Sequence, residues 1–182
     1  MLNLGTERIE TPRLILRPFV LEDAPAMYRN WASDPEVTRF LTWPTHQNPE
    51  ISAMVVESWV AQYPQKDFYQ WAIVPKAFGE PVGSISVVRQ EGDTFEIGYC
   101  IGKKWWRKGI TSESLTGVMD FLFDRVGVRR IEAKHDVNNP GSGAVMKKCG
   151  LRYEGTTLQS DRNNQGICDS AHYALTVEDR NP

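Results

Sequence analysis

Three β-rich runs follow one another between Tyr69 and Ile101, and they constrain the fold more than any other feature of the chain. The runs are YQWAIVP, VGSISVVRQ and TFEIGYCIG, and only short breaks rich in Gly, Pro and Asp separate them. Such short breaks connect antiparallel strands, because parallel neighbours need a crossover of about a dozen residues or more. The sequence therefore predicts an antiparallel meander at the centre of the molecule.

Alternating and helical patterns precede the meander. Thr11–Phe19 alternates apolar side chains with arginines, which predicts a half-buried first strand. Asp23 is then expected to cap a helix, and Asn48 followed by Pro49 is expected to open a second one. The chain thus enters the meander through one strand and two helices.

Further elements follow the meander. Residues 109–126 carry apolar side chains at helical spacing and predict a long helix. After it we expect a strand over 129–137, a short helix over 140–148, and closing strands near 151–159 and 169–177. The predicted order is β-α-α-β-β-β-α-β-α-β-β, which indicates the α+β class: a mixed, mostly antiparallel central sheet flanked by helices. One β-α-β crossover runs through the long helix.

The composition is that of one soluble domain. Hydrophobic residues make up 41% and charged residues 24% of 182 residues, and no repeat or linker divides the chain, so we expect a single domain over residues 1–182. A net charge of -2 gives no molecule-wide positive field for nucleic acid. The three cysteines form no C-x-x-C pair, and no signal or membrane-spanning pattern is present. We expect a cytoplasmic protein that binds neither nucleic acid nor membrane.

The segment Lys103–Glu113, KKWWRKGITSE, lies between a β-run and the long helix. It combines basic side chains with Gly109 at a helix start, where free N–H groups and the positive dipole end favour an anion. These features indicate a phosphate cradle, although a basic turn without a ligand fits the same local pattern. The Walker loop and the dinucleotide-binding fingerprint are both absent. A nucleic-acid patch at KKWWRK is disfavoured by the net charge.

A second segment, Asn138–Leu151, reads NNPGSGAVMKKCGL. Here a strand gives way to a short helix with Pro140 at its first position and Gly150 at its end. Asn139 fits an N-cap whose side-chain amide could instead bind a ligand. An ordinary capped helix is the alternative, and only the pairing with the basic segment favours a ligand.

Together the two segments are similar to the GNAT acetyltransferases, in particular to the branch that acetylates ribosomal-protein N-termini. The family's phosphate loop, Q/R-x-x-G-x-G/A with a glutamate beyond it, resembles Trp106–Thr111 and Glu113. The later motif, N-x-x-S/A followed by an apolar helix and K-x-G-F, resembles residues 139–151. Upstream, Glu96–Ile101 looks like the strand before the loop, and TPRLILRPFVLEDA resembles the first strand and helix of the branch.

The resemblance implies an acetyl-CoA-dependent N-acetyltransferase whose acceptor is a primary amine, above all a ribosomal or other protein N-terminus. The chain departs from the family pattern at Trp106, at Thr111, and at Met146, where many members place a tyrosine acid. A bulge around Gly98–Ile101 would open the sheet so that the pantetheine arm of coenzyme A pairs with the strand edge. The residues implied to contact the cofactor are Tyr99, Cys100, Ile101, Trp106, Arg107, Lys108, Gly109, Ile110, Thr111, Asn139 and Ser142.

Acetyl transfer to an amine requires a neutral amine, a donor for the developing oxyanion and a proton for the leaving thiolate. Glu96 is the candidate base or water-positioning group, with an exposed strand carboxylate as the alternative. Asp161 is the reserve base, because the ribosomal branch carries an acidic residue in the corresponding loop. Ser142 matches the branch's proposed serine acid, with a simple first-turn serine as the alternative. Cys100 has no histidine nearby and the histidines lack metal-ligand spacing, so we expect neither covalent catalysis nor a metal.

The acceptor pocket is expected to be lined by aromatic side chains. Phe40 and Trp43 lie in a Pro-bounded loop that resembles the substrate wall of the ribosomal branch, and Trp71 comes from a neighbouring strand. A satellite hydrophobic cluster is the alternative for all three. A small-molecule amine acetyltransferase and a noncatalytic acyl-CoA-binding module, which Met146 would tolerate, remain alternative functions. We expect a monomer or a homodimer.

Overall fold

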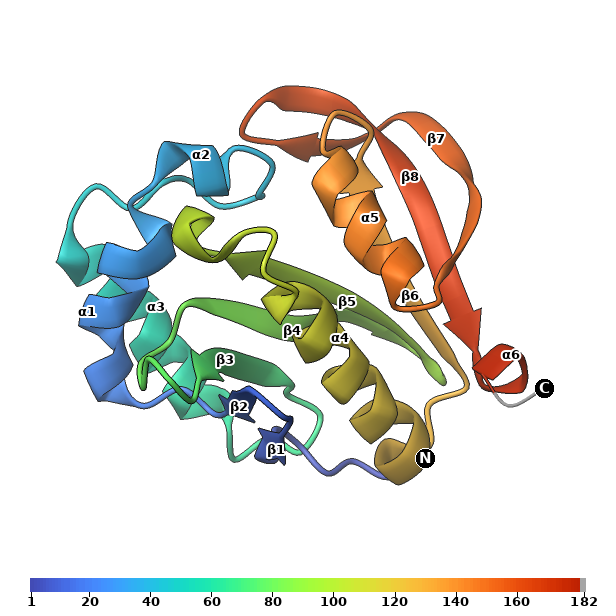
Figure 1. Ribbon diagram of the computed structural model, residues 1–182, viewed down its shortest axis with the longest axis horizontal. Coiled ribbons are helices and arrows are strands. Elements are labelled where there is room, and N and C mark those ends of the chain that lie inside the picture. The colour runs from blue at the N-terminus through green and yellow to red at the C-terminus, as the bar shows by residue number, and fades with distance from the viewer. Residues whose placement is uncertain (181–182) are drawn as a thin grey trace.

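The predicted meander forms the middle of an eight-stranded sheet in the computed structural model, which describes residues 1–180 (Figure 1). Its strands are β3 (Gln70–Pro75), β4 (Gly83–Glu91) and β5 (Thr94–Ile101), and each is antiparallel to the next. The strand order is β1-β2-β3-β4-β5-β6-β8-β7, and within residues 1–180 the β5–β6 pair alone is parallel. The prediction of a mixed, mostly antiparallel sheet is confirmed.

The sheet begins with a short hairpin rather than one long strand. β1 (Ile9–Glu10) pairs with β2 (Leu14–Arg17), and β2 pairs with β3. The predicted strand over Thr11–Phe19 is therefore too long, and β1 was not expected. The reason is that Pro12 and Pro18 lack the N–H group that a strand ladder requires, so they confine β2 to the residues between them.

The predicted crossover is present and opens the sheet. α4 (Ile110–Phe121), extended by a π turn over Leu122–Val126, connects β5 to the parallel strand β6 (Arg130–Asp136). The register of β5 and β6 covers only Thr94–Glu96 against Arg130–Glu132, so the rest of β5 has no partner on that side. Figure 1 shows the two strands diverging from this point. The resulting gap lies between the N-terminal ends of two helices.

The bulge was predicted on the wrong strand. The register shift lies in β4 between Val87 and Arg89, opposite β5, and not at Gly98–Ile101. Gly98 stays in regular pairing with Ser86, and a Cβ on Gly98 would come 2.9 Å from the side chain of Val88, the extra residue of the bulge. The bulging side chain on β4 thus needs a glycine opposite it.

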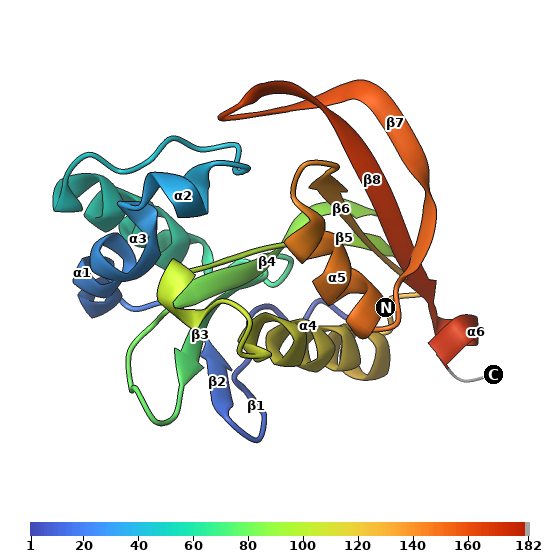
Figure 2. The same ribbon diagram turned by 45° about the horizontal axis from the view of Figure 1, so that its top comes forward.

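A long hairpin closes the chain. α5 (Pro140–Lys148) follows β6, and then β7 (Arg152–Asn163) and β8 (Gly166–Thr176) form an antiparallel pair before α6 (Val177–Arg180). Both strands extend well beyond the predicted 151–159 and 169–177, because the polar residues at the tip continue the pairing although they bury almost nothing. Figure 2 shows this hairpin reaching over the molecule toward α2 (Pro35–Thr38).

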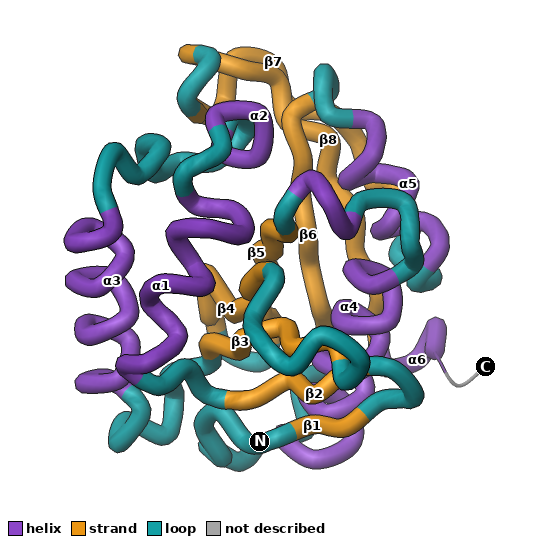
Figure 3. Tube along the Cα trace, turned by 60° about the vertical axis from the view of Figure 1, so that its left-hand side comes forward, coloured by secondary structure: helices purple, strands orange, loops and turns teal. Residues whose placement is uncertain are grey.

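Helices cover both faces of the sheet (Figure 3). α4 and α5 cover one face over the larger hydrophobic core, and α1 (Ala24–Met27) and α3 (Pro49–Gln62) cover β2 to β4 on the other over a smaller core. Asn48 caps α3 as predicted, accepting a hydrogen bond from the N–H of Ile51.

Asp23 lies at the N-cap position of α1 as predicted, but its side chain makes no capping hydrogen bond to that helix. A 3₁₀ turn already begins at Leu21, and the Asp23 carboxylate instead binds the Arg17 guanidinium and accepts the N–H of Val20. The buried carboxylate thus ties the first helix back to β2 rather than capping it.

Candidate active site

The predicted phosphate cradle is a loop that ends at an uncapped helix. A 3₁₀ turn over Lys103–Trp105 leads to Arg107 and Gly109, whose φ angles are +58° and +74°. Gly109 is the N-cap of α4 and offers no side chain to the first-turn N–H groups, which belong to Ile110, Thr111 and Ser112. These groups and the positive end of the helix dipole are therefore available to an anion.

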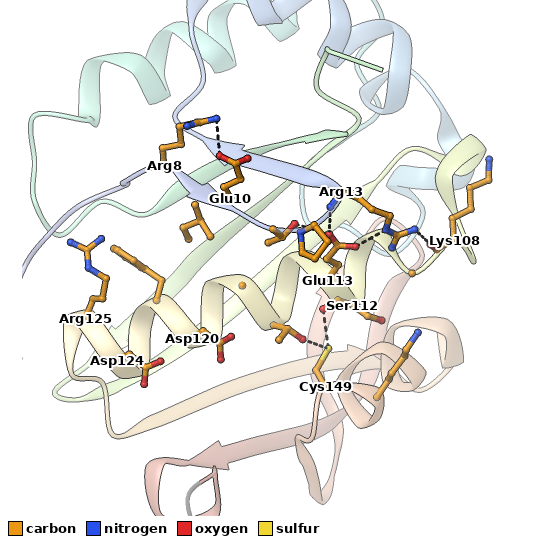
Figure 4. A pocket seen from close by; sticks show the side chains of 18 of the residues that line it. Arg8, Glu10, Arg13, Lys108, Ser112, Glu113, Asp120, Asp124, Arg125 and Cys149 are labelled. Atoms are coloured by element: carbon orange, nitrogen blue, oxygen red, sulfur yellow. Dashed lines mark hydrogen bonds and ion pairs between the residues drawn. The ribbon is translucent and has the colours of Figure 1, made fainter. Parts of the chain in front are cut away.

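A buried carboxylate fixes this loop to the sheet. Glu113, in the first turn of α4, accepts hydrogen bonds from the Thr11 hydroxyl and from the N–H and Nε of Arg13, while Nη1 of Arg13 donates to the Lys108 carbonyl (Figure 4). Burial raises the pKa of Glu113, but the hydrogen bonds from Thr11 and Arg13 outweigh burial and lower it below its ordinary value. The role of Arg13 was missed, because its partner lies 100 residues away in sequence.

Basic side chains surround the start of α4. Arg107 and Lys108 are exposed, and a Cβ on Gly109 would lie 3.8 Å from the Lys148 Nζ at the end of α5. All four residues line one end of a cleft of about 1120 Å³ that runs along α4 past the β1–β2 hairpin. Trp106 contributes no cation; its indole N–H donates to the Ile101 carbonyl at 2.9 Å and so closes the loop onto the end of β5.

The second predicted segment meets β5 across the open gap. The Tyr99 hydroxyl lies 3.0 Å from the Ser142 Oγ and 3.1 Å from the Ser142 carbonyl, in the first turn of α5. Asn139 is the N-cap of α5, but its side chain makes no capping hydrogen bond, so its amide is free for another partner.

Cys100 points to the other face, where its Sγ lies 3.5 Å from the Ser84 Oγ and burial raises the pKa of the thiol. Only its backbone can face the gap.

The two candidate bases converge on one ammonium group. Glu96, at the point where β5 and β6 separate, is 12% exposed and pairs with the Arg89 Nε at 3.0 Å, so it is not an exposed strand carboxylate. The Lys134 Nζ lies 3.9 Å from Glu96 and 2.8 Å from Asp161. Burial raises the pKa of Asp161, but hydrogen bonds from Lys134 and Ser170 outweigh it, so this pKa lies below its ordinary value. Lys134 was not singled out in the sequence.

A polar cavity, separate from the cleft along α4, lies beside Glu96. It measures about 520 Å³ and includes Glu96 and Lys134 together with Thr157 and His172 from the hairpin. The cavity opens on the side of the sheet opposite α4 and α5, because Glu96 and Lys134 alternate with Phe95 and Ala133 of the larger core. An acceptor could therefore approach from one face while a cofactor enters from the other.

The structure corrects one of the three aromatic residues assigned to the acceptor pocket. Trp71 is fully buried in the larger core, donates its indole N–H to the Glu7 carbonyl at 2.7 Å, and meets Phe121 edge-on. It is a core residue, because it points to the α4 face of the sheet. Phe40 and Trp43 are half-buried, and Trp43 also packs against the smaller core.

The loop that carries these two aromatics is fastened to the hairpin tip. Asn164 donates its side-chain amide to the carbonyls of Thr38 and Trp43, at 2.8 and 2.7 Å, and its backbone N–H to Leu41. We call this set of contacts the Asn164 clasp. It joins the loop after α2 to the tip of the β7–β8 hairpin, and no sequence pattern indicated it.

The described residues offer neither a cluster of metal-ligating side chains nor a membrane-spanning helix. Over residues 1–180, no three His, Cys, Asp or Glu side chains come together as a group that could hold a metal ion. None of the helices in that range is both long and apolar enough to cross a membrane.

The chain is similar in sequence and in fold to known acetyltransferases. Residues 13–152 match the family described as acetyltransferase (GNAT) domain. The chain is 30% identical over 169 residues to the uncharacterized N-acetyltransferase YoaA of Bacillus subtilis, covering 92% of this chain and 95% of that protein. A shorter region of 70 residues, 38% of this chain and 36% of the relative, is 33% identical to the ribosomal protein uS5-alanine N-acetyltransferase of Escherichia coli. A solved structure of the ribosomal L7/L12 α-N-protein acetyltransferase RimL with coenzyme A superimposes with a TM-score of 0.83 at 23% identity, covering 95% of this chain and 99% of that one.

Proposed function

The chain belongs to the GNAT family of acetyltransferases, and on that premise we propose that it transfers acetyl from acetyl-CoA directly to the α-amine of a protein or peptide N-terminus. The observation that carries the proposal is the gap between β5 and β6. It begins at Glu96, has the uncapped start of α4 at its outer end, and faces Ser142 at the start of α5.

The residues around α4 fit the phosphates of coenzyme A. The pyrophosphate requires N–H donors and positive charge, which the first turn of α4 with Arg107 and Lys108 supplies. The unpaired edge of β5 beyond Glu96 offers N–H and carbonyl groups to the amides of the pantetheine arm, which can add there as a short strand would. The thioester would then lie between β5 and the first turn of α5.

The groups at the inner end of the gap fit the remaining chemistry. Glu96 or Asp161, directly or through a water, accepts the proton that the amine loses. Ser142 donates its hydroxyl proton to the sulfur as the carbon–sulfur bond breaks. The new amide and free coenzyme A are the products, and no covalent enzyme intermediate is required.

The ion-paired carboxylates favour an α-amine over a lysine side chain. At neutral pH an α-amine of pKa about 7.7–8.0 loses its proton at a cost of about 1 kcal/mol, whereas a lysine of pKa about 10.4 costs about 5 kcal/mol. Asp161, whose pKa lies below its ordinary value because Lys134 and Ser170 donate hydrogen bonds to it, is a weak base and suits the smaller of these two costs. The partial similarity to a uS5-alanine acetyltransferase supports the same class of acceptor.

The proposal is tested by thiol release from acetyl-CoA with a matched panel of acceptors. The panel contains peptides with a free N-terminus, the same peptides with a blocked N-terminus, and small amines including amino acids, a polyamine and an amino sugar. We expect turnover with the free peptides at least about tenfold above that with the blocked ones. Turnover confined to small amines would show that the acceptor is a small molecule and not a protein N-terminus. Tight binding of acetyl-CoA without turnover on any amine would indicate a noncatalytic binding module.

A further inference from the structure

Tyr99 joins β5 to α5 at the point where the strands of the sheet separate. Its ring packs against the larger core beside α5, and its hydroxyl lies 3.0 Å from the Ser142 Oγ and 3.1 Å from the Ser142 carbonyl. The ring is held by packing and the hydroxyl by two contacts to one residue. Tyr99 therefore fixes the position of the serine relative to the strand edge.

The chemistry of Tyr99 makes it a hydrogen-bond donor under ordinary conditions. Burial raises the pKa of the phenol, so the hydroxyl keeps its proton at neutral pH. The phenol has one proton, which it donates either to the Ser142 carbonyl or to the Ser142 Oγ. In the second arrangement the serine's own proton is free to point elsewhere. The phenol then also stabilises negative charge on that oxygen when the proton leaves.

The neighbouring residue on the helix cannot take this part. Met146, four residues after Ser142 and thus on the same face of α5, is 1% exposed and has no proton to give. His135, under the same turn, has its Nδ1 on the Asp136 carbonyl, and its Nε2 would lie 2.5 Å from a Cβ on Gly143. In residues 1–180, the hydroxyl in hydrogen-bond contact with Ser142 is therefore that of Tyr99.

We propose that Tyr99 is a positioning residue that acts through Ser142 in the acetyl-transfer step. The inference rests on the proposed function. As the carbon–nitrogen bond forms and the carbon–sulfur bond breaks, the Ser142 hydroxyl proton passes to the sulfur, and the Tyr99 hydrogen bond stabilises the serine oxygen. The proton released by the amine passes through the Glu96 carboxylate to solvent. Solvent returns a proton to the Ser142 oxygen, so the step is balanced.

The test is a double-mutant cycle on kcat with Tyr99→Phe, Ser142→Ala and the double variant. Tyr99→Phe should lower kcat about 10- to 100-fold with little change in the KM for acetyl-CoA, as expected for losing one hydrogen bond to a developing charge. In the Ser142→Ala background the same substitution should change kcat less than about twofold, because the group it acts through is gone. Tyr153→Phe, which removes an exposed hydroxyl on β7, is the matched control and should leave kcat unchanged.

The possible failures are distinguishable. A wild-type protein that binds acetyl-CoA but acetylates no amine would overturn the proposed function and this inference with it. An active wild type whose Tyr99→Phe variant is equally active would overturn the inference alone. Equal losses from Tyr99→Phe with and without Ser142 would also overturn it, since they would reveal a structural defect or a direct role in the reaction.

Discussion

At the scale of single residues, the strongest constraint on cofactor binding is the backbone of Gly109. Its φ of +74° is a conformation in which a side chain costs about 1–2 kcal/mol. A Cβ would also come 3.2 Å from the Nη2 of Arg13, whose Nη1 binds the Lys108 carbonyl of the loop. We expect Gly109→Ala to weaken the binding of coenzyme A at least about tenfold in calorimetry.

Gly79 provides the matched control for this prediction. Its φ is +80° and a Cβ there would meet nothing within 4 Å, so Gly79→Ala carries the same backbone strain in the turn between β3 and β4. Both variants should lose similar stability, and only Gly109→Ala should lose affinity. Equal affinity of the two variants for coenzyme A would remove Gly109 from the phosphate site.

The roles of some single residues could be predicted from the sequence, and the roles of others could not. Gly109 and Asn48 were predictable, because their roles depend on local backbone geometry. Trp71 was assigned to the wrong place, since the face of a strand that meets solvent depends on which helices cover it. The contact of Tyr99 with Ser142 and the position of Lys134 beside Asp161 could not be predicted, because they join residues 43 and 27 positions apart in the sequence.

At the scale of elements, the attachment of α4 to β2 depends on Glu113. Its folded-state pKa lies below the unfolded value, so it stabilises the protein above the unfolded pKa, and this contribution is lost as the pH falls through the folded pKa. Glu113→Gln should therefore lower the free energy of unfolding by about 2 kcal/mol at pH 7, as expected for lost hydrogen bonds to a charged group. The difference from the wild type should shrink toward zero under acidic conditions.

Denaturant unfolding at a series of pH values measures this effect. The control is Glu178→Gln, which removes an exposed pairing with Arg129 and should cost less than about 1 kcal/mol at every pH. If the free energy of unfolding that Glu113→Gln loses stayed constant from neutral to strongly acidic pH, the charge of Glu113 would not be what attaches α4.

The Asn164 clasp makes a second prediction at this scale. Asn164→Ala removes the side-chain amide that binds the loop at Thr38 and Trp43. The loop that carries Phe40 and Trp43, the expected wall of the acceptor pocket, should therefore become less firmly held. We expect the KM for a peptide acceptor to rise about three- to tenfold while the KM for acetyl-CoA stays constant, because we propose that the cofactor enters from the other face. Gln165→Ala, at an exposed neighbouring position, is the control. An equal rise in both KM values would show that the hairpin only stabilises the fold.

Elements with strong periodicity were predictable, and elements held by distant contacts were not. The meander and α4 have apolar patterns that local geometry alone enforces. The tip of the β7–β8 hairpin is polar and exposed, and it is ordered by its clasp onto a loop more than 120 residues earlier. The β4 bulge likewise has no signal in β4 itself, because it is recognised only from the opposing Gly98.

In the molecule as a whole, the diverging strands β5 and β6 leave a gap in the sheet beyond Glu96. α4 and α5 cover one face and present the start of each helix to the gap, while the polar cavity with Glu96 and Lys134 lies on the opposite face. A cofactor and an acceptor can thus reach the same point from opposite sides. The proposed function fits this arrangement, since direct transfer requires both substrates to be present together.

The central claim is direct acetyl transfer to an α-amine, and acetyl-site mapping on one peptide tests it most directly. The peptide carries a free N-terminus and an internal lysine, and mass spectrometry locates the acetyl group after incubation with the protein and acetyl-CoA. We predict acetylation of the α-amine at a rate at least about tenfold above that of the lysine, with no acetyl group retained on the protein's cysteines. Acetylation mainly on the lysine, or an acetylated cysteine that forms and decays during turnover, would contradict it.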